Sequence, residues 1–438
     1  MITKPVSYDK IKQNYKLEFV NMTKTSQYGG LPTFTRFLSQ ANLNERLVEL
    51  LGKSAAKAML QIMLGSLMGA RTMEDVALFS KDKVIKDFIV RPLSATGIVR
   101  TLKNLSKSQI QSIHEFSLSN ALLDTASGTD KDYFQTFDFD ATAVEKYGKQ
   151  EGVDYGYLEQ DKIKKCYQYL IVRSEALNTI LYGTIRDGSA HSQNDFCGYL
   201  NMILPLFNRQ WSIRIRADSG YFNEAAFDLC HEYNVDFFVK APMSRARKAQ
   251  AMSPSLYWTE DLTNPDISYA TRSTVTANKT IWNEIFKRIK DTTSPEGYTF
   301  HCLATNDLIA KPQAAYSFYN QRANIENINS ELKGDLGLGH IVTKWFDVND
   351  VITQSIIIVY QMLSHFKRTC LDMADKDKRV ETLRDQLFEV PAEIMKSARR
   401  TWLRVYNTFF DGLTYARIFA RIEALKNVFV LAYRLRSG

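Results

Sequence analysis

The sequence of 438 residues predicts an α/β protein. A helical N-terminal region precedes a mixed sheet with flanking helices, and a β-rich insertion interrupts the sheet domain. Two observations predict this class. Apolar residues recur at the spacing of amphipathic helices up to about residue 128, and from residue 133 strands alternate with helices. The chain exceeds the ~250–300 residues at which one core stops growing, so several domains are expected.

Five helices are predicted in the N-terminal region, at residues 43–52, 54–68, 72–79, 95–105 and 109–123. Thr72 and Asp75 have the spacing of a capping box at the start of the third helix. Short amphipathic helices that follow one another closely predict a helical bundle. Residues 94–105 fit either the recognition helix of a helix-turn-helix or a plain packing helix, and the packing helix is the preferred interpretation.

The pattern changes at residues 133–142, where Phe137 and Phe139 alternate with Asp138 and Asp140. This alternation predicts a strand with one apolar face. Residues 167–173 and 177–185 predict two more strands joined by a tight turn, and hence an antiparallel meander. A helix at 193–207, a strand at 212–218, a helix at 224–233 and a strand at 236–240 follow. Asp218 ends its strand, where open α/β sheets place their sites.

This order of three antiparallel strands, helix, strand, helix and fifth strand is that of an RNase H-like catalytic core with a mixed five-stranded sheet. The closing helix comes only at about 314–334. The intervening segment has Pro and Gly breaks and three strand-like stretches, at 267–275, 282–289 and 298–304, so it predicts a β-rich insertion. Helices are then expected at 349–367 and 378–388, followed by a strand at 402–409 and a helix at 414–435.

These boundaries divide the chain into five predicted parts. They are a helical DNA-binding domain (1–128), the first part of the catalytic core (129–242), the insertion (243–312), the second part of the core with the glutamate helix (313–375) and a basic C-terminal region for DNA contact or dimerisation (376–438).

The net charge of +8 and the pI near 9.0 favour an anionic partner. From residue 384 onward there are ten Lys or Arg against five Asp or Glu, which fits either a solvated basic surface or a DNA-contacting one. The basic cluster in this region comprises Lys396, Arg399, Arg400 and Arg404.

Several classes of protein are disfavoured. The five cysteines form no CxxC pair, so neither a zinc site nor a disulfide scaffold is expected. The N-terminus lacks the hydrophobic region of a signal peptide. The strongest apolar run, residues 351–363, is interrupted by polar residues and is too short to span a bilayer. A cytoplasmic protein without a membrane partner is therefore expected.

Three carboxylates would converge if the strand order is right: Asp140 on the first strand, Asp218 after the fourth and Glu326 on the closing helix. Phosphodiester chemistry can use two divalent ions that activate the nucleophile and stabilise the leaving oxygen. Oxygen donors without a Cys or His cluster favour Mg²⁺ or Mn²⁺. Each residue has an ordinary alternative. Asp218 could form a turn or cap a helix, Asp138 could replace or tune Asp140, and Glu326 alone could be a surface residue.

The closing helix also carries a stripe of residues suited to phosphates. At about 100° per residue, Arg322, Glu326 and Lys333 would fall within about 60° of Tyr319 on a regular helix. A carboxylate flanked by an arginine, a lysine and a tyrosine predicts nucleic-acid chemistry.

The spacing of this stripe resembles the signature of DDE transposases of bacterial insertion sequences, in the cut-and-paste group marked by Tyr, Arg, Glu and Lys. Two residues separate Tyr319 from Arg322, three separate Arg322 from Glu326, and six separate Glu326 from Lys333, as in that signature.

Other segments resemble the family as well. The segments Asp140-Ala-Thr and Asp218-Ser-Gly-Tyr resemble the first and second acidic motifs of the family. Thr305-Asn306, which precedes the helix that carries Glu326, is similar to the family as well. Tyr28-Gly-Gly-Leu and residues 65–75 resemble one subgroup. One departure is residues 187–191, Asp-Gly-Ser-Ala-His, where relatives usually carry a turn like Arg-Pro-Gly-Asn.

The resemblance implies roles for six residues. Those that would hold two Mg²⁺ or Mn²⁺ ions are Asp140, Asp218 and Glu326. Those that would contact the DNA end are Tyr319, Arg322 and Lys333. Members of the group often hold a flipped base against an aromatic residue of the insertion, for which Trp282 or Trp258 is available.

The resemblance also implies an activity and its partners. The enzyme would bind terminal inverted repeats of double-stranded DNA, free a 3′-OH at each transposon end by hydrolysis and join it to target DNA. It would act as a homodimer in a synaptic complex, in the bacterial cytoplasm with the nucleoid. Two alternatives stay open: a structure-specific nuclease of the same fold without strand transfer, and a non-catalytic DNA-binding descendant.

Overall fold

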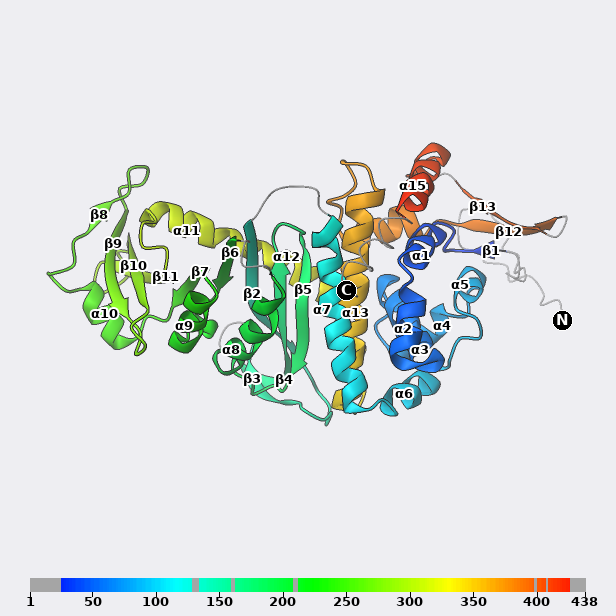
Figure 1. Cartoon of the computed structure of the whole chain (residues 1–438), viewed down its shortest axis with the longest axis horizontal. Coiled ribbons are helices and arrows are strands. Elements are labelled where there is room, and N and C mark those ends of the chain that lie inside the picture. Colours follow the sequence, from blue (N-terminus) through cyan, green and yellow to red (C-terminus); the bar gives the residue numbers. More distant parts are fainter. Residues whose placement is uncertain are drawn as a thin grey trace, which may run out of the picture.

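The computed structural model describes residues 25–127, 134–158, 162–207, 212–397, 400–406 and 409–425. The molecule is elongated, with the N-terminal helices near one end and the strands between residues 259 and 305 at the other (Figure 1). Two long helices, α7 (Lys107–Ser127) and α13 (Phe346–Cys370), run side by side between the two halves.

The N-terminal region is a helical bundle, as predicted. Its helices before α7 are α1 (Leu31–Gln40), α2 (Leu43–Leu51), α3 (Lys53–Leu67), α4 (Met73–Phe79), α5 (Lys83–Phe88) and α6 (Ala95–Lys103). The capping box is confirmed, because the Thr72 side chain accepts a hydrogen bond from the Asp75 amide and the Asp75 carboxylate accepts one from the Thr72 amide. Helices α1 and α5 were not predicted.

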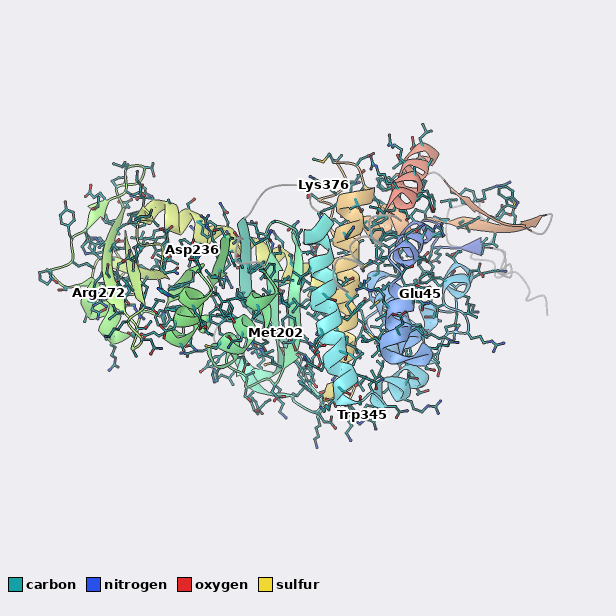
Figure 2. All side chains as sticks on the ribbon, viewed as in Figure 1. Glu45, Met202, Asp236, Arg272, Trp345 and Lys376 are labelled. Atoms are coloured by element: carbon teal, nitrogen blue, oxygen red, sulfur yellow. The ribbon has the colours of Figure 1, made fainter. Side chains whose placement is uncertain are left out.

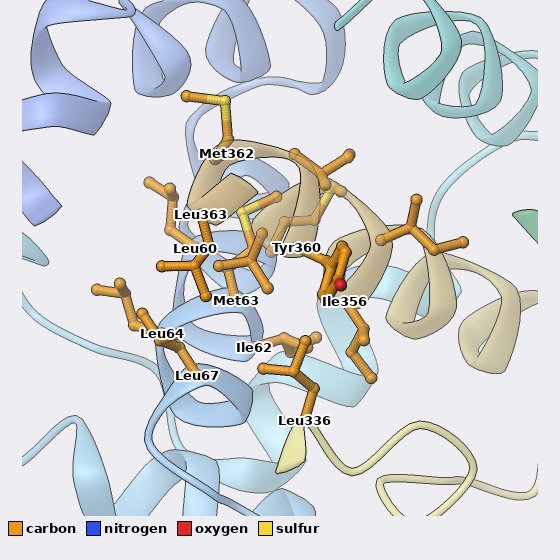
Figure 3. Packing of buried hydrophobic residues seen from close by; sticks show 14 of the residues in the cluster. Leu60, Ile62, Met63, Leu64, Leu67, Leu336, Ile356, Tyr360, Met362 and Leu363 are labelled. Carbon is orange, nitrogen blue, oxygen red and sulfur yellow. The ribbon is translucent and has the colours of Figure 1, made fainter. Parts of the chain in front are cut away.

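Helix α13 joins the bundle to the sheet. One side packs against α3, where Leu60 and Met63 lie close to Ile356 and Leu363 (Figure 3). The other side meets a strand edge, and Gln354 donates a hydrogen bond of 2.8 Å to the carbonyl oxygen of Gly183. The polar residues that interrupt the apolar run are therefore buried and hydrogen-bonded, as buried polar groups must be.

The central sheet is mixed, and the predicted meander is confirmed. Its first strands are β2 (Phe134–Glu145), β3 (Asp154–Tyr157), β4 (Ile163–Ser174), β5 (Thr179–Arg186), β6 (Ser212–Ala217) and β7 (Val235–Ala241). Strand β4 is antiparallel to both β2 and β5, whereas β6 is parallel to β2 and to β7. The order is therefore β5-β4-β2-β6-β7, and β3 pairs with the start of β4.

The alternation in β2 divides its side chains between two faces of the sheet. Phe137 and Phe139 are buried in the core formed with α8 (Ser192–Ile203) and α9 (Glu224–Glu232). Asp140 points to the opposite face, which the helical segment after residue 312 covers. The apolar face of β2 thus fixes where Asp140 lies.

The sheet has ten strands rather than the five expected for the core. The strands after β7 are β8 (Thr259–Glu260), β9 (Ile267–Val275), β10 (Ile281–Lys290) and β11 (Tyr298–Thr305). They continue the same sheet because β11 pairs antiparallel with β7, from Cys302 opposite Ala241 to Thr305 opposite Phe238. Helix α10 (Arg245–Ala251) connects β7 to these strands.

The segment after β11 is helical but irregular. It comprises α11 (Pro312–Asn320), a 3₁₀ turn η4 (Gln321–Ala323), α12 (Asn324–Ser330) and a π turn η5 (Glu331–Asp335). The expectation of a regular helix over 314–334 is therefore wrong in its geometry.

The C-terminal region adds a small sheet and a helix. Its elements are α14 (Val380–Leu383), a π turn η6 (Arg384–Phe388), β12 (Ala392–Ser397), β13 (Arg400–Val405) and α15 (Gly412–Ala424), and β12 also pairs with β1 (Thr25–Ser26). Arg404 lies 3.4 Å from Glu393. The side chains of Lys396, Arg399 and Arg400, and the predicted helix beyond residue 425, lie outside the described residues.

All five cysteines are free thiols. Among the helices of the described ranges, none combines the length and the apolar character that crossing a membrane requires.

Candidate functional site

Asp140 lies near the middle of β2, opposite Ile171 of β4, with 14% of its side chain exposed. One carboxylate oxygen is paired with Nη2 of Arg322. The other accepts a hydrogen bond of 2.6 Å from Nδ2 of Asn329. Two groups of the helical segment therefore fix the orientation of this carboxylate.

Asp218 directly follows β6, as its predicted position at a strand end requires. Its Oδ1 accepts a 2.9 Å hydrogen bond from the amide of Gly220 and caps the short 3₁₀ turn Ser219–Tyr221. Its Oδ2 lies 4.0 Å from Nη2 of Arg322. Asp218 therefore both caps a turn, the ordinary alternative, and faces the same guanidinium as Asp140.

The four residues of the stripe come from four different helical elements. Tyr319 is in α11, Arg322 in η4, Glu326 in α12 and Lys333 in η5. The 3₁₀ and π turns change the rotation per residue, so the assumed spacing of about 100° does not hold along the segment. The π turn is held from the N-terminal region by Arg71, which donates a 2.9 Å hydrogen bond to the carbonyl oxygen of Lys333.

A cavity of about 920 Å³ lies beside the carboxylates. Asp140, Glu326, Asn329 and Lys333 all contribute to its wall. The structure therefore brings together side chains from β2 and from the helical segment, which are almost 190 residues apart in sequence, whereas Asp218 is not among the residues that line this cavity.

The charges around Asp140 oppose one another. The pKa of Asp140 is raised to about 6, chiefly by burial; Arg322 lowers the pKa, and the negative charges of Asp218 and Glu326 raise it. Burial likewise raises the pKa of the Tyr319 phenol, which lies within the field of the same charges. A like-charged and partly desolvated cluster of this kind favours the binding of positive charge.

The donor atoms suit a hard divalent cation, although their present arrangement does not form a closed site. In the described ranges, no group of three or more His, Cys, Asp or Glu side chains is placed to hold a metal ion. Arg322 supplies the positive charge next to Asp140 instead. Asn329 is 5% exposed, and its Oδ1 is buried without a hydrogen-bond partner among the described residues. The carboxylates and this free oxygen fit a Mg²⁺ or Mn²⁺ ion in kind.

Asn329 was not predicted. It stands three residues after Glu326, so both lie on one side of α12. That spacing was the signal available in the sequence, but Asn is common on helix surfaces, and only the position of α12 against β2 reveals the contact.

Asp138 does not reach the cavity. It is fully buried, and its carboxylate accepts hydrogen bonds from Nε of Arg216 at 2.6 Å and from Nη1 of Arg173 at 2.9 Å. Arg216 also donates a 2.9 Å hydrogen bond to the carbonyl oxygen of Phe318, at the end of α11. Asp138 thus belongs to a buried ionic network that joins β2, β4 and β6 to the helical segment.

The two tryptophans of the insertion differ in their surroundings. Trp282 is 2% exposed and packs against Phe222 and Phe227, so its ring is not accessible to a base in this structure. Trp258 is half-buried, and the guanidinium of Arg288 covers its ring at 4.4 Å.

Comparison with known proteins identifies the class and then the family. The chain is a transposase-type nuclease of the DDE class. It belongs to the family of the transposase DDE domain group 1, whose family model matches residues 29–427. DDE transposases bind DNA, carry out DNA transposition and use divalent metal ions. Because the chain belongs to this family, these general properties are assigned to it.

The search of curated proteins finds no match. Among solved structures, the chain is similar to the cryo-EM structure of the piggyBac transposase synaptic complex with hairpin DNA, at 11% sequence identity and a TM-score of 0.39, over 82% of this chain and 79% of that chain.

Proposed function

We propose that this protein is a cut-and-paste DNA transposase of a bacterial insertion sequence. The strands β5-β4-β2-β6-β7 would form an RNase H-like core, into which residues 243–312 are inserted. The observation that carries the proposal is that Asp140 shares one guanidinium, that of Arg322, with Asp218 and one cavity with Glu326. Their separation in sequence makes a chance surface cluster a poor explanation.

In this proposal, Asp140, Asp218 and Glu326 hold two Mg²⁺ or Mn²⁺ ions. When bound, the ions supply an activated water or 3′-OH and stabilise the charge on the leaving oxygen. Asn329 keeps the Asp140 carboxylate in one orientation. Water breaks a phosphodiester bond at the transposon end and frees a 3′-OH. This hydroxyl would then attack a phosphodiester of the target DNA, forming a new P–O bond and displacing the 3′-oxygen of the target strand.

The DNA end would be held by Tyr319, Arg322 and Lys333. Lys333 lines the cavity beside Glu326, and Arg322 lies next to Asp140 and Asp218. A guanidinium contacts phosphate through paired hydrogen bonds, so Arg322 would bind a DNA phosphate beside Asp140 and Asp218.

The remaining parts of the chain would serve binding and assembly. The helical region 1–128 would recognise inverted repeats, and residues 376–438 would contact DNA or a second subunit in the synaptic complex. Exposed apolar side chains near β13, such as Trp402 and Phe409, support an interface in this region. The place of action would be the bacterial cytoplasm, with the nucleoid.

The test is to incubate the protein with Mg²⁺ and a DNA that carries the flanking inverted repeats. The proposal expects release of a 3′-OH, hairpin or other excised ends, and products joined to target DNA. Cleavage without joining would instead identify a nuclease of the same fold. Binding without either reaction would identify a non-catalytic DNA-binding protein.

Arg322→Ala is expected to weaken binding of the transposon end about tenfold, because one charge-assisted contact to phosphate is lost. The slope of log K against log salt should fall by about one. Binding is measured in Ca²⁺ by fluorescence anisotropy over a salt series. Arg36→Ala is the control, since Arg36 is exposed and pairs with Glu423 far from the cavity. If the affinity for the DNA end and the salt slope are both unchanged, Arg322 does not contact DNA and serves only to hold Asp140.

Asn329→Ala is expected to lower the affinity for Mn²⁺ by about 10- to 100-fold, as for groups that orient metal ligands. The substitution removes the 2.6 Å hydrogen bond to Asp140 and the free buried oxygen. Binding is followed by the Mn²⁺ electron paramagnetic resonance signal, with circular dichroism as the check on folding. Asn327→Ala, an exposed position of the same helix, should bind Mn²⁺ like the wild type. Equal affinities for both variants contradict the role of Asn329.

A further inference from the structure

The cavity beside the carboxylates extends to the hairpin formed by β3 and β4. Its wall includes Asp140 and Glu326 at one end, and Tyr157, Lys162 and Lys164 of the hairpin. The acidic residues and the lysines therefore share one continuous groove. The proposed role of Asp140 and Glu326 does not explain the hairpin side chains.

The strand register places Tyr157 on the same face of the sheet as Asp140. Asp140 is opposite Ile171 of β4, and Tyr157 is opposite Ile163 of the same strand. An even number of residues separates Ile163 from Ile171, so all four side chains point to one face. At ~3.3 Å per residue, Tyr157 lies ~26 Å along the strand from Asp140.

The hairpin is held in place at its base. A Cβ added at Gly156 would lie 2.0 Å from the carbonyl oxygen of Gly188, so β3 packs directly against the loop that follows β5. This loop is the segment 187–191 that departs from the usual turn. Gln168 also donates a 3.3 Å hydrogen bond to the carbonyl oxygen of Tyr157. Tyr157 is therefore on a fixed strand, although its side chain is 61% exposed.

The exposed side chains of the hairpin include both apolar and cationic ones. Tyr155 and Ile163 are exposed like Tyr157, and the lysines at 162, 164 and 165 are exposed beside them. The Lys165 ammonium lies 5.7 Å from the centre of the Tyr155 ring. Lys333 adds a cation from the helical segment on another wall of the groove. Aromatic rings interleaved with lysines suit a polyanion that has flat groups, whereas an apolar protein partner would not require the lysines.

We propose that the β3–β4 hairpin is a second DNA contact, which binds the DNA backbone up to about eight base pairs from the cleaved phosphate, at 3.4 Å per base pair. Lys162 contacts a phosphate, and Tyr157 packs on a sugar or base. Lys164 lies on the opposite face of the strand and pairs with Glu145 at 2.7 Å, so it has no part in this contact. The inference rests on the proposed function, because the cleaved phosphate is placed at Asp140 and Glu326. It adds a partner surface outside the carboxylate site.

The experiment compares hydroxyl-radical footprints of the full-length protein on a duplex with the flanking inverted repeat, in Ca²⁺ to prevent cleavage. The test variant is the double substitution Tyr157→Ala and Lys162→Ala, both at exposed positions. The matched control is Tyr257→Ala with Lys290→Ala, an exposed tyrosine in the loop before β8 and an exposed lysine at the end of β10. Cleavage in Mg²⁺ at saturating protein is measured separately.

The wild type and the control variant should protect phosphates out to about eight base pairs from the cleavage position. The hairpin variant should lose the outer protection, bind about tenfold more weakly and still cleave at saturation. The inference is overturned if the hairpin variant has the wild-type footprint and affinity. It is also overturned if the control variant loses the outer protection while the hairpin variant keeps it. Absence of cleavage by the wild type would count against the proposed function, whatever the footprint shows.

Discussion

Glu326→Gln is expected to abolish DNA cleavage while leaving DNA-end binding unchanged. Glu326 is exposed on α12 and faces the cavity that it shares with Asp140. The amide keeps the size of the side chain but removes the negative charge that a metal ion requires. Loss of several kcal/mol of transition-state stabilisation corresponds to about a 1000-fold lower rate of 3′-OH release.

The measurement separates binding from chemistry. Anisotropy in Ca²⁺ reports DNA-end affinity, and single-turnover cleavage in Mg²⁺ reports the rate. Glu45→Gln is the control, because Glu45 is an exposed glutamate of α2 in the N-terminal half, away from the sheet (Figure 2). Cleavage by Glu326→Gln at the rate of the control would show that the assignment of Glu326 is wrong. A parallel loss of binding would point to a role in holding DNA.

Elements with a strong local pattern could be predicted from the sequence. The alternation at Phe137 and Phe139 predicts β2 because successive side chains of a strand point to opposite faces, here one apolar and one polar. Thr72 with Asp75 predicts the start of α4 because the capping contacts are local. Helix α1 was missed because Gly29, Gly30 and Pro32 resemble a loop. Proline in the first turn is in fact favourable, and the helix buries an apolar face.

The candidate site could be predicted only in outline. The strand order indicated that Asp140, Asp218 and Glu326 could meet, but it could not show that Arg322 lies between the first two carboxylates. The 3₁₀ and π turns that orient Arg322 and Lys333 depend on tertiary contacts such as that from Arg71. The pairing of β7 with β11 is likewise a tertiary contact, so no local sequence pattern indicated that the sheet continues from β7 into β11.

Arg216→Ala is expected to destabilise the protein by about 3–5 kcal/mol, the usual cost of removing one partner from a buried ion pair. Arg216 is fully buried, and it donates to Asp138, to the carbonyl oxygen of Phe318 and to Oε1 of Gln321. Without it, Asp138 keeps only Arg173 as a cationic partner in the core. The end of α11 also loses its donor, directly before the turn that carries Arg322.

Urea denaturation of the metal-free protein measures this effect as a lower midpoint. Arg36→Ala is a suitable control because its ion pair with Glu423 is about half exposed, and exposed pairs contribute less than about 1 kcal/mol. Arg216→Lys should fall between the wild type and Arg216→Ala, since lysine restores the charge without the paired geometry of the guanidinium. If Arg216→Ala unfolds at the same urea concentration as Arg36→Ala, the network does not hold the helical segment on the sheet. The position of Arg322 must then come from its own contact with Asp140.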